Sequence, residues 1–384
     1  MSTFDFDRII DRQQTASLKW DRYRGRDVLP LWVADMDFHS PPAVIAALHR
    51  RVEHGIFGYT VAPDELPATI ISLLAERYGW QIQPEWLVWL PGLVTGLNVA
   101  CRTVGDEGDE VLTTVPVYPP FLSAPANSRR RLRSVPLVQK QDRWEVDFEA
   151  FESAITNRTR LFLLCSPHNP TGRVFSRSEL ERLTAICLEH DLVICSDEIH
   201  AELVLAPDRH HAPTAVLAAE VARRTITLMA PSKTYNIPGL GCSFAIIPDQ
   251  TLRRNFRRAM AGIVPEVSLF GYTAALAAYQ EGGEWLEALL VYLRGNQDRV
   301  MAAVNAMPGM AVNRVEATYL AWIDTRAAAI SEPAAFFEAA GVGLSDGRDF
   351  GGPGFVRLNF GCPRPTLDKA LIRMARALER RENL

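Results

Sequence analysis

Short apolar runs alternate with helix-like segments from about residue 85 to about residue 283. Five of these runs have the length and the β-branched content of buried strands. They cover residues 110–115, 160–165, 192–196, 225–229 and 243–247. Between the second run and the third, Ser176 and Glu179 form a capping-box pattern, which predicts a helix that runs toward His190. Strands that alternate with helices predict an α/β domain whose mainly parallel sheet is covered by helices on both faces.

The pattern changes after about residue 283. A long helix and two strand-like segments follow, at residues 285–307, 318–324 and 354–360. We place a large domain at residues 46–283 and a smaller α+β domain at residues 1–45 and 284–384, which the N-terminal segment joins.

The composition is that of a protein with a substantial core, since 48% of the 384 residues are hydrophobic and 22% are charged. The formal net charge is -4, and acidic and basic residues are interleaved. One short basic run, residues 129–133, is interpreted as a solvated face. The charge pattern therefore gives no support to nucleic-acid binding.

The six cysteines include no C-x-x-C pair and no His/Cys cluster with zinc spacing, so we expect no metal site. The N-terminal residues are polar, and no apolar stretch is long enough to span a bilayer. We therefore expect a cytoplasmic protein with reduced thiols and no membrane association.

Polar or reactive side chains follow four of the apolar runs, in the segments "VPVYPPF", "SPHNPTGR", "SDEIH" and "APSKTYNIPG". In open α/β sheets, ligands bind beyond the carboxyl ends of the strands. A single Asp, Asn or Lys at a strand end is usually a cap or a turn residue. Four such residues at one sheet edge, Tyr118, Asn169, Asp197 and Lys233, instead predict a common site.

Each of these four side chains has a role in holding pyridoxal 5'-phosphate (PLP). Lys233 is the candidate catalytic residue, because a partly desolvated lysine can form a Schiff base with the aldehyde and then act as a base at the substrate Cα. Asp197 can pair with the pyridine nitrogen and keep it protonated. Asn169 can donate to the 3'-oxygen of the ring, and Tyr118 can stack on the ring face.

The phosphate needs backbone N–H groups at the start of a helix, together with hydroxyl groups. The segment "LPGLVTGLNVA" supplies the N–H groups of Leu93, Val94 and Thr95, and Ser232 supplies a further hydroxyl. This glycine-rich turn is weak evidence of a phosphate site when taken alone.

The order and wording of these segments resemble the fold-type I PLP enzymes of aminotransferase class I/II, and in particular the cystathionine β-lyase or cysteine-S-conjugate β-lyase branch (MalY/PatB-like). The motif "NPTG" marks only the superfamily, whereas "WVADMDF", "DEIHAEL" and "RLNFGCPR" resemble the lyase branch. The resemblance covers nearly the whole chain. It implies a mainly parallel sheet of the seven-stranded type between helices, and a smaller α+β domain.

Carried over to this sequence, the resemblance supports the roles given above to Lys233, Asp197 and Asn169. It places His200 beside the 3'-oxygen, where many aminotransferases have a tyrosine. Arg357 matches the arginine that holds the substrate α-carboxylate, a task that suits its planar fork.

Further positions follow from the same resemblance. The backbone near Ala34 and Asp35 is expected close to the substrate carboxylate, and Tyr59 is expected to reach the phosphate of the neighbouring subunit, which implies a homodimer with shared sites. Glu198 is interpreted as a structural residue. Gly241 stands where many aminotransferases have a phosphate-binding arginine, and the lyase branch commonly lacks that arginine.

The resemblance implies a PLP-dependent C–S β-lyase that cleaves L-cystathionine or a related cysteine S-conjugate to a thiol, pyruvate and ammonia. Two enzymatic alternatives stay open. One is an aminotransferase, which requires a 2-oxo acid. The other is a specialised-metabolism relative that processes a bulky S-conjugate by β-elimination or by decarboxylation with deamination. A purely regulatory protein of this fold is disfavoured, because the set of Lys233, Asp197, Asn169 and Arg357 is intact.

Overall fold

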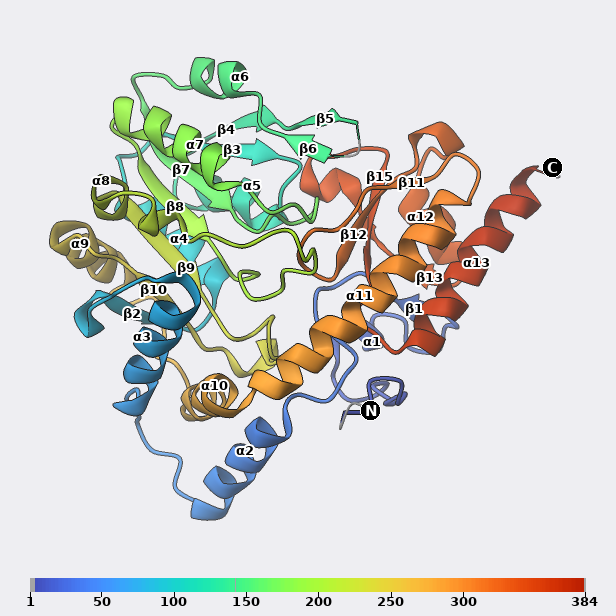
Figure 1. The fold of residues 1–384 in the computed structure, drawn as a ribbon, viewed down its shortest axis with the longest axis horizontal. Coiled ribbons are helices and arrows are strands. Elements are labelled where there is room, and N and C mark those ends of the chain that lie inside the picture. The colour runs from blue at the N-terminus through green and yellow to red at the C-terminus, as the bar shows by residue number, and fades with distance from the viewer. Residues whose placement is uncertain (1–3, 142, 383–384) are drawn as a thin grey trace.

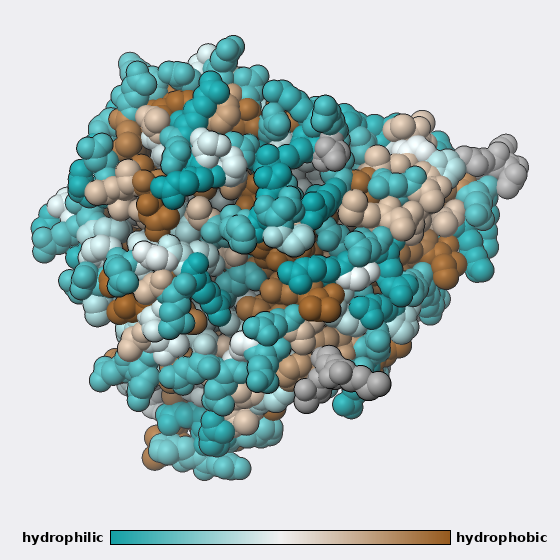
Figure 2. Space-filling view, viewed as in Figure 1, coloured by the Kyte–Doolittle hydropathy of each residue, from teal (hydrophilic) through white to brown (hydrophobic). Residues whose placement is uncertain are grey.

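The computed structural model describes residues 4–141 and 143–382. Figure 1 shows a large sheet with its helices on one side of the molecule and a smaller sheet with further helices on the other. Hydrophilic residues cover most of the face seen in Figure 2, with smaller hydrophobic patches between them. No helix of residues 4–141 and 143–382 is long and apolar enough to cross a membrane.

The large sheet has seven strands in the order β2-β10-β9-β8-β7-β3-β4. Their bounds are β2 (Leu87–Leu90), β3 (Glu110–Val115), β4 (Arg131–Pro136), β7 (Thr159–Cys165), β8 (Val193–Asp197), β9 (Thr225–Met229) and β10 (Ser243–Ile246). β10 pairs antiparallel with both β2 and β9, and the other neighbouring strands pair in parallel. The predicted mainly parallel seven-stranded sheet is therefore confirmed.

Alternation of side chains along the strands divides the core between two helical layers. In β7, Leu161 and Leu163 share a core with one set of helices, whereas Phe162 and Leu164 share a core with the other. The first set is α4 (Leu93–Thr103), α5 (Pro119–Asn127) and α9 (Gln250–Met260). The second set is α6 (Phe148–Ser153), α7 (Arg177–Glu189) and α8 (Ala219–Arg223), and α3 (Glu65–Tyr78) with α10 (Leu269–Glu281) packs on the β2 and β10 end of the sheet.

The predicted elements match the structure closely. The predicted strands at 110–115 and 225–229 coincide with β3 and β9. Those at 160–165 and 243–247 differ from β7 and β10 by one residue at one end, and the one at 192–196 is shifted by one residue from β8. Helix α7 begins with the predicted capping box, in which Ser176 and Glu179 bind each other's backbone N–H groups.

Two strands of the large sheet were not predicted. β2 has only four residues, and β4 is an edge strand whose side chains are mostly exposed. The basic run at residues 129–133 therefore extends into a sheet edge, where its charged side chains face solvent and oppose pairing with other chains.

The smaller sheet has the order β11-β12-β15-β14 and is antiparallel. Its strands are β11 (Ala311–Val312), β12 (Leu320–Asp324), β14 (Ser345–Asp346) and β15 (Phe355–Asn359). The helices around it are α11 (Gly283–Asn305), α12 (Pro333–Ala339) and α13 (Arg364–Glu382). The long helix, the strand-like segment at 318–324 and the final strand were all predicted.

The N-terminal segment packs with this smaller sheet. Phe6, Leu31 and Met36 belong to the same buried cluster as Val356 and Leu358 of β15. Two short elements of this region, β1 (Leu29–Pro30) and β13 (Val342–Gly343), form a parallel pair. Helices α1 (Leu18–Asp21) and α2 (Pro42–His54) flank β1 along the chain, and a hairpin of β5 (Val138–Lys140) and β6 (Arg143–Glu145) completes the set of strands. The division into a large domain at residues 46–283 and a smaller one at residues 1–45 and 284–384 stays a prediction.

Candidate active site

The carboxyl ends of three adjacent parallel strands bring the predicted polar residues to one edge of the large sheet. Asp197 is the last residue of β8, and it lies between Cys165 of β7 and Leu228 of β9. Asn169 follows β7 in the next loop, and Lys233 lies in the turn after β9. Residues separated by more than sixty positions therefore meet because the strands that carry them are neighbours.

Asp197 is a buried carboxylate. Its residue is 5% exposed, and its Oδ1 accepts a hydrogen bond from the backbone N–H of Ile199 at 3.1 Å. Desolvation raises the pKa of Asp197 to about 7, and the positive charge of Lys233 only partly opposes this rise. A carboxylate in this position favours a cationic partner.

Lys233 lies close to the N-terminal segment, and its Nζ donates a hydrogen bond to the backbone oxygen of Ala34. Desolvation lowers the pKa of Lys233 to about 8, although the carboxylates of Asp35 and Asp197 act in the opposite direction. About a tenth of the Lys233 side chains therefore carry an uncharged amine at pH 7, compared with well under a thousandth at the ordinary lysine pKa. That form is the one required of a nucleophile or a general base.

Arg357 is buried in β15 and reaches the same space from the smaller sheet. Its Nη1 donates to Asn169 Oδ1 at 3.0 Å and its Nη2 donates to the backbone oxygen of Trp32 at 2.8 Å. Its guanidinium lies over the ring of Phe350, at 4.6 Å from the centroid. Desolvation lowers the pKa of Arg357 to about 10, and its Nε has no hydrogen-bond partner among the described residues. An incoming carboxylate would supply the missing acceptor.

Tyr118 and His200 lie at the same edge of the sheet. The backbone N–H of Tyr118 donates to Asn169 O at 3.0 Å, which fixes the start of α5 beside the loop after β7. His200 is buried, and desolvation lowers the pKa of its imidazole to about 3. The ring is therefore neutral, and its Nδ1 has no partner within the described ranges.

The start of α4 has the features of an anion-binding helix end. Among the described residues, no side chain caps this helix. Its first backbone hydrogen bond runs from Gly96 N–H to Gly92 O at 3.2 Å. The N–H groups of Leu93, Val94 and Thr95 precede that first bond. A Cβ placed on Gly92 would meet no atom within 4 Å, so the space at the helix start is open. Ser232 is half-buried in the turn that carries Lys233.

These side chains fit the cofactor that the sequence predicts. Asp197 offers a buried carboxylate without a salt-bridge partner among the described residues, and Lys233 offers an amine with a lowered pKa. The amide oxygen of Asn169 accepts a hydrogen bond from Arg357, whereas its N–H groups donate to no acceptor among the described residues. Together with the open helix start at Gly92, they form a donor set for a ring, an aldehyde and a phosphate.

Glu198 has a structural role, as predicted. Its carboxylate is buried and accepts hydrogen bonds from Ser196 Oγ at 2.8 Å and from the backbone N–H of Thr214 at 2.9 Å. Its other oxygen lies 2.8 Å from Nε2 of His211, which is also buried. This cluster anchors the backbone immediately after Asp197.

The sequence analysis missed a charge network in the N-terminal segment. Arg12 binds the carboxylates of Asp35 and Asp37 at 2.8 and 2.6 Å, and the fully buried Lys19 binds Asp37 at 2.8 Å. Lys19 also donates to the backbone oxygen of Asp35 at 3.0 Å. The network holds the stretch that presents Ala34 to Lys233. No motif signals it, because Arg12 and Lys19 are ordinary charged residues in a polar segment.

Tyr59 lies away from Lys233, Asp197 and Arg357, because its side chain is exposed to solvent whereas Asp197 and Arg357 are buried. It is fully exposed, in a stretch that also exposes Ile56, Phe57 and Val61. The stretch borders a hollow with Trp89 and Phe270 in its lining.

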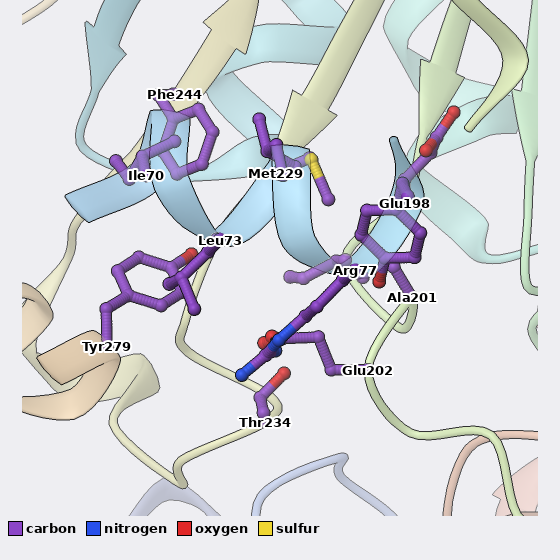
Figure 3. A pocket seen from close by; sticks show the side chains of 14 residues that line it. Ile70, Leu73, Arg77, Glu198, Ala201, Glu202, Met229, Thr234, Phe244 and Tyr279 are labelled. Atoms are coloured by element: carbon purple, nitrogen blue, oxygen red, sulfur yellow. The ribbon is translucent and has the colours of Figure 1, made fainter. Parts of the chain in front are cut away.

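A small pocket of about 20 Å³ lies next to the site without belonging to it (Figure 3). Its lining is mostly apolar, and the ion pair of Arg77 and Glu202 closes one side. The cavity contains Thr234 and Glu198 in its wall, whereas Asp197, Lys233 and Arg357 do not line it. It has room for a water molecule and not for a substrate.

Comparison with known proteins agrees with this geometry. The family model of aminotransferase class I and II matches residues 26–374. The chain belongs to this family. Over 97% of its length and the whole of the relative, it is 37% identical to the cystathionine beta-lyase PatB of Bacillus subtilis. The resemblance to the lyase branch is therefore confirmed.

Two solved structures of relatives superpose closely on this family member. The crystal structure of OvoB shares 48% identity and a TM-score of 0.96, with coverage of 98% of this chain and 99% of that chain. The PLP-bound C–S lyase from Staphylococcus hominis shares 32% identity and a TM-score of 0.92, with coverage of 98% of both chains.

The burial of Asp197 predicts a pH-dependent stability in protein stripped of cofactor. The raised pKa means that the folded chain holds a proton that the unfolded chain has lost, so the stabilisation is complete below pH 3.8 and disappears as the pH rises through about 7. Asp197→Asn should remove this loss, with a difference on the order of 4 kcal/mol in the free energy of unfolding at pH 8. Denaturant unfolding at several pH values measures it.

Asp298→Asn is a matched control, because Asp298 is exposed on α11. This variant should keep the pH dependence of the wild type. Identical curves for the wild type and Asp197→Asn between pH 4 and pH 8 would show that Asp197 is ionised in the folded chain.

Proposed function

We propose that this chain is a PLP-dependent carbon–sulfur β-lyase, which converts L-cystathionine or a related cysteine S-conjugate to a thiol, pyruvate and ammonia. The observation that carries the proposal is the meeting of Lys233, Asp197 and Arg357 in one space, with the lysine pKa lowered to about 8. The names of the relatives, cystathionine beta-lyase and PLP-bound C–S lyase, support the reaction and the cofactor.

In this proposal, the side chains at the sheet edge bind PLP. Lys233 would bond to its aldehyde, Asp197 would pair with the ring nitrogen, and Asn169 would donate to the 3'-oxygen. His200 would support that oxygen, and Tyr118 would stack on the ring. Leu93, Val94, Thr95 and Ser232 would bind the phosphate.

The substrate is positioned by the smaller sheet and by the N-terminal segment. Arg357 has an unpartnered Nε with which to bind the α-carboxylate, and the backbone of Ala34 and Asp35 borders the same space. PLP supplies an electron sink at the substrate Cα when it is bound. Lys233 accepts the Cα proton in its uncharged form, and the sulfur leaves with the electron pair of the broken C–S bond.

Gly241 favours a lyase activity over the aminotransferase alternative. It has a positive φ of 61°, and a Cβ there would lie 3.1 Å from Pro91 O, just before the start of α4. The phosphate-binding arginine that many aminotransferases carry at this position is therefore absent and would be strained. The phosphate site depends instead on backbone N–H groups and hydroxyls.

We also propose that the protein is a cytoplasmic homodimer. All six cysteines are buried and unpaired, as expected in a reducing compartment. The exposed stretch with Ile56, Phe57 and Tyr59 would be covered by a second copy, and Tyr59 would reach the phosphate in that copy's site.

Cofactor attachment provides the first test. Protein loaded with PLP should absorb in the visible range, and borohydride reduction should fix the cofactor to Lys233, as peptide mapping would show. Lys140→Ala removes an exposed lysine and should leave the label unchanged, whereas Lys233→Ala should abolish it. A label on another lysine would contradict the assignment.

The products provide the second test. L-cystathionine should yield a thiol, pyruvate and ammonia without any added 2-oxo acid, and Lys233→Ala should lower the rate by at least about 10²-fold. Thiol and pyruvate assays in parallel measure the outcome. Turnover that requires a 2-oxo acid would identify an aminotransferase, and carbon dioxide released with an aldehyde would identify the specialised-metabolism alternative.

Subunit complementation provides the third test. A Tyr59 variant with no activity and Lys233→Ala should recover activity after they are mixed, because a hybrid dimer contains one site with both residues intact. Random exchange would restore about a quarter of the wild-type activity. A monomer in sedimentation, or no recovery once exchange is demonstrated, would rule out shared sites.

A further inference from the structure

A second polar groove lies outside the proposed active site. It has a volume of about 140 Å³, and its lining includes four arginines, Arg143, Arg173, Arg209 and Arg314. These arginines come from strand β6, from the loop after β7, from the loop after β8 and from the segment before β12. The groove therefore joins loops of the large sheet to the smaller sheet.

Arg173 is the buried member of the group. It is 2% exposed, its Nη2 binds Glu179, and its guanidinium lies 4.1 Å from the centroid of the Phe175 ring. Its Nε and Nη1 have no hydrogen-bond partner among the residues that the structure describes. Buried charged donors without an acceptor are costly, so this site favours an additional anion.

The carboxylates around the groove are already shared. Glu316 Oε1 lies 3.3 Å from Arg143 and 3.2 Å from Arg209, and Glu316 Oε2 accepts the backbone N–H of Val174 at 2.7 Å. Each oxygen of this carboxylate thus already has a donor.

Asp208 is shared in the same way, between Arg314 at 3.1 Å and Arg209 at 3.8 Å. The four guanidinium groups therefore face three carboxylates, those of Glu179, Glu316 and Asp208. Within the described ranges, the arginines of the groove therefore carry one more charge than the carboxylates that face them, and several of their N–H groups have no acceptor.

We propose that this groove binds an oxyanion of the phosphate or carboxylate type. Guanidinium groups bind such anions through paired N–H donors in one plane, and several arginines on one hollow suit an anion better than lysines would. A volume of about 140 Å³ holds one small oxyanion together with a few waters. The proposal does not depend on the reaction at Lys233.

Binding in the groove would act on the loop that carries Asn169. The backbone N–H of His168 donates to Arg173 O at 2.9 Å, and the N–H of Ala317 donates to Gly172 O at 2.8 Å. Arg173 belongs to the loop after β7 and Arg314 to the segment before β12, so an anion held between these two arginines would link the two segments. It would therefore stabilise the contact between the loop after β7 and the segment before β12.

The test uses the PLP-loaded protein, so that the phosphate position of the cofactor is already filled. The thermal unfolding midpoint is measured against inorganic phosphate and, separately, against acetate, with chloride keeping the ionic strength constant. At least one of the two anions should raise the midpoint with a saturable dependence. Saturation by phosphate alone indicates a phosphate site, and saturation by acetate as well indicates a general oxyanion site.

Variants locate the effect. The double variant Arg209→Gln with Arg314→Gln should raise the half-saturating anion concentration at least 10-fold. The control double variant Arg254→Gln with Arg258→Gln, which changes two exposed arginines of α9, should leave it unchanged. Asp208→Asn removes a competing carboxylate and should lower the half-saturating concentration several-fold, an effect that misfolding cannot produce. No saturable effect of either anion, or an unchanged effect in the Arg209 and Arg314 variant, overturns the proposal.

Discussion

Desolvation of charged side chains at the carboxyl edge of the large sheet is the constraint on which the site depends. Asp197 and Lys233 are both shielded from water, and burial disfavours the charged form of each, so that their pKa values move toward each other, to about 7 and about 8. Such groups are stable only where the surrounding backbone holds them in place. The structure meets this requirement on two sides.

The first support lies within the large sheet. Glu198 and His211 form a buried pair that fixes the chain after Asp197, and the parallel register of β7, β8 and β9 fixes the distance between the loops that follow them. The second support comes from the N-terminal segment, where Lys19 and Arg12 neutralise Asp35 and Asp37. This buried network holds Ala34 against Lys233. The site is thus held by residues of the large sheet and of the N-terminal segment, which lie far apart in the sequence.

Arginines carry out two different tasks in the molecule. Arg357 and Arg173 are both buried, and both have guanidinium nitrogens without an acceptor among the described residues. Arg357 faces the space of Lys233 and Asp197, whereas Arg173 faces a groove with three further arginines. Each of these buried cations keeps at least one nitrogen without an acceptor among the described residues, which favours the substrate carboxylate at Arg357 and an oxyanion at Arg173.

The sequence by itself determined the fold class and selected the residues of the candidate site. Apolar runs of strand length, the capping box at Ser176 and the polar residues at the strand ends are local signals, and they sufficed to predict β3, β7, β8, β9 and β10 and to select Lys233, Asp197 and Asn169. The edge strand β4 escaped because its exposed side chains remove the apolar pattern of a buried strand. Only the tertiary structure decided which charges compensate one another. The ion pairs of Lys19 with Asp37 and of Arg209 with Glu316 depend on how separate segments pack, and ion pairing between residues so placed leaves no periodicity in the sequence.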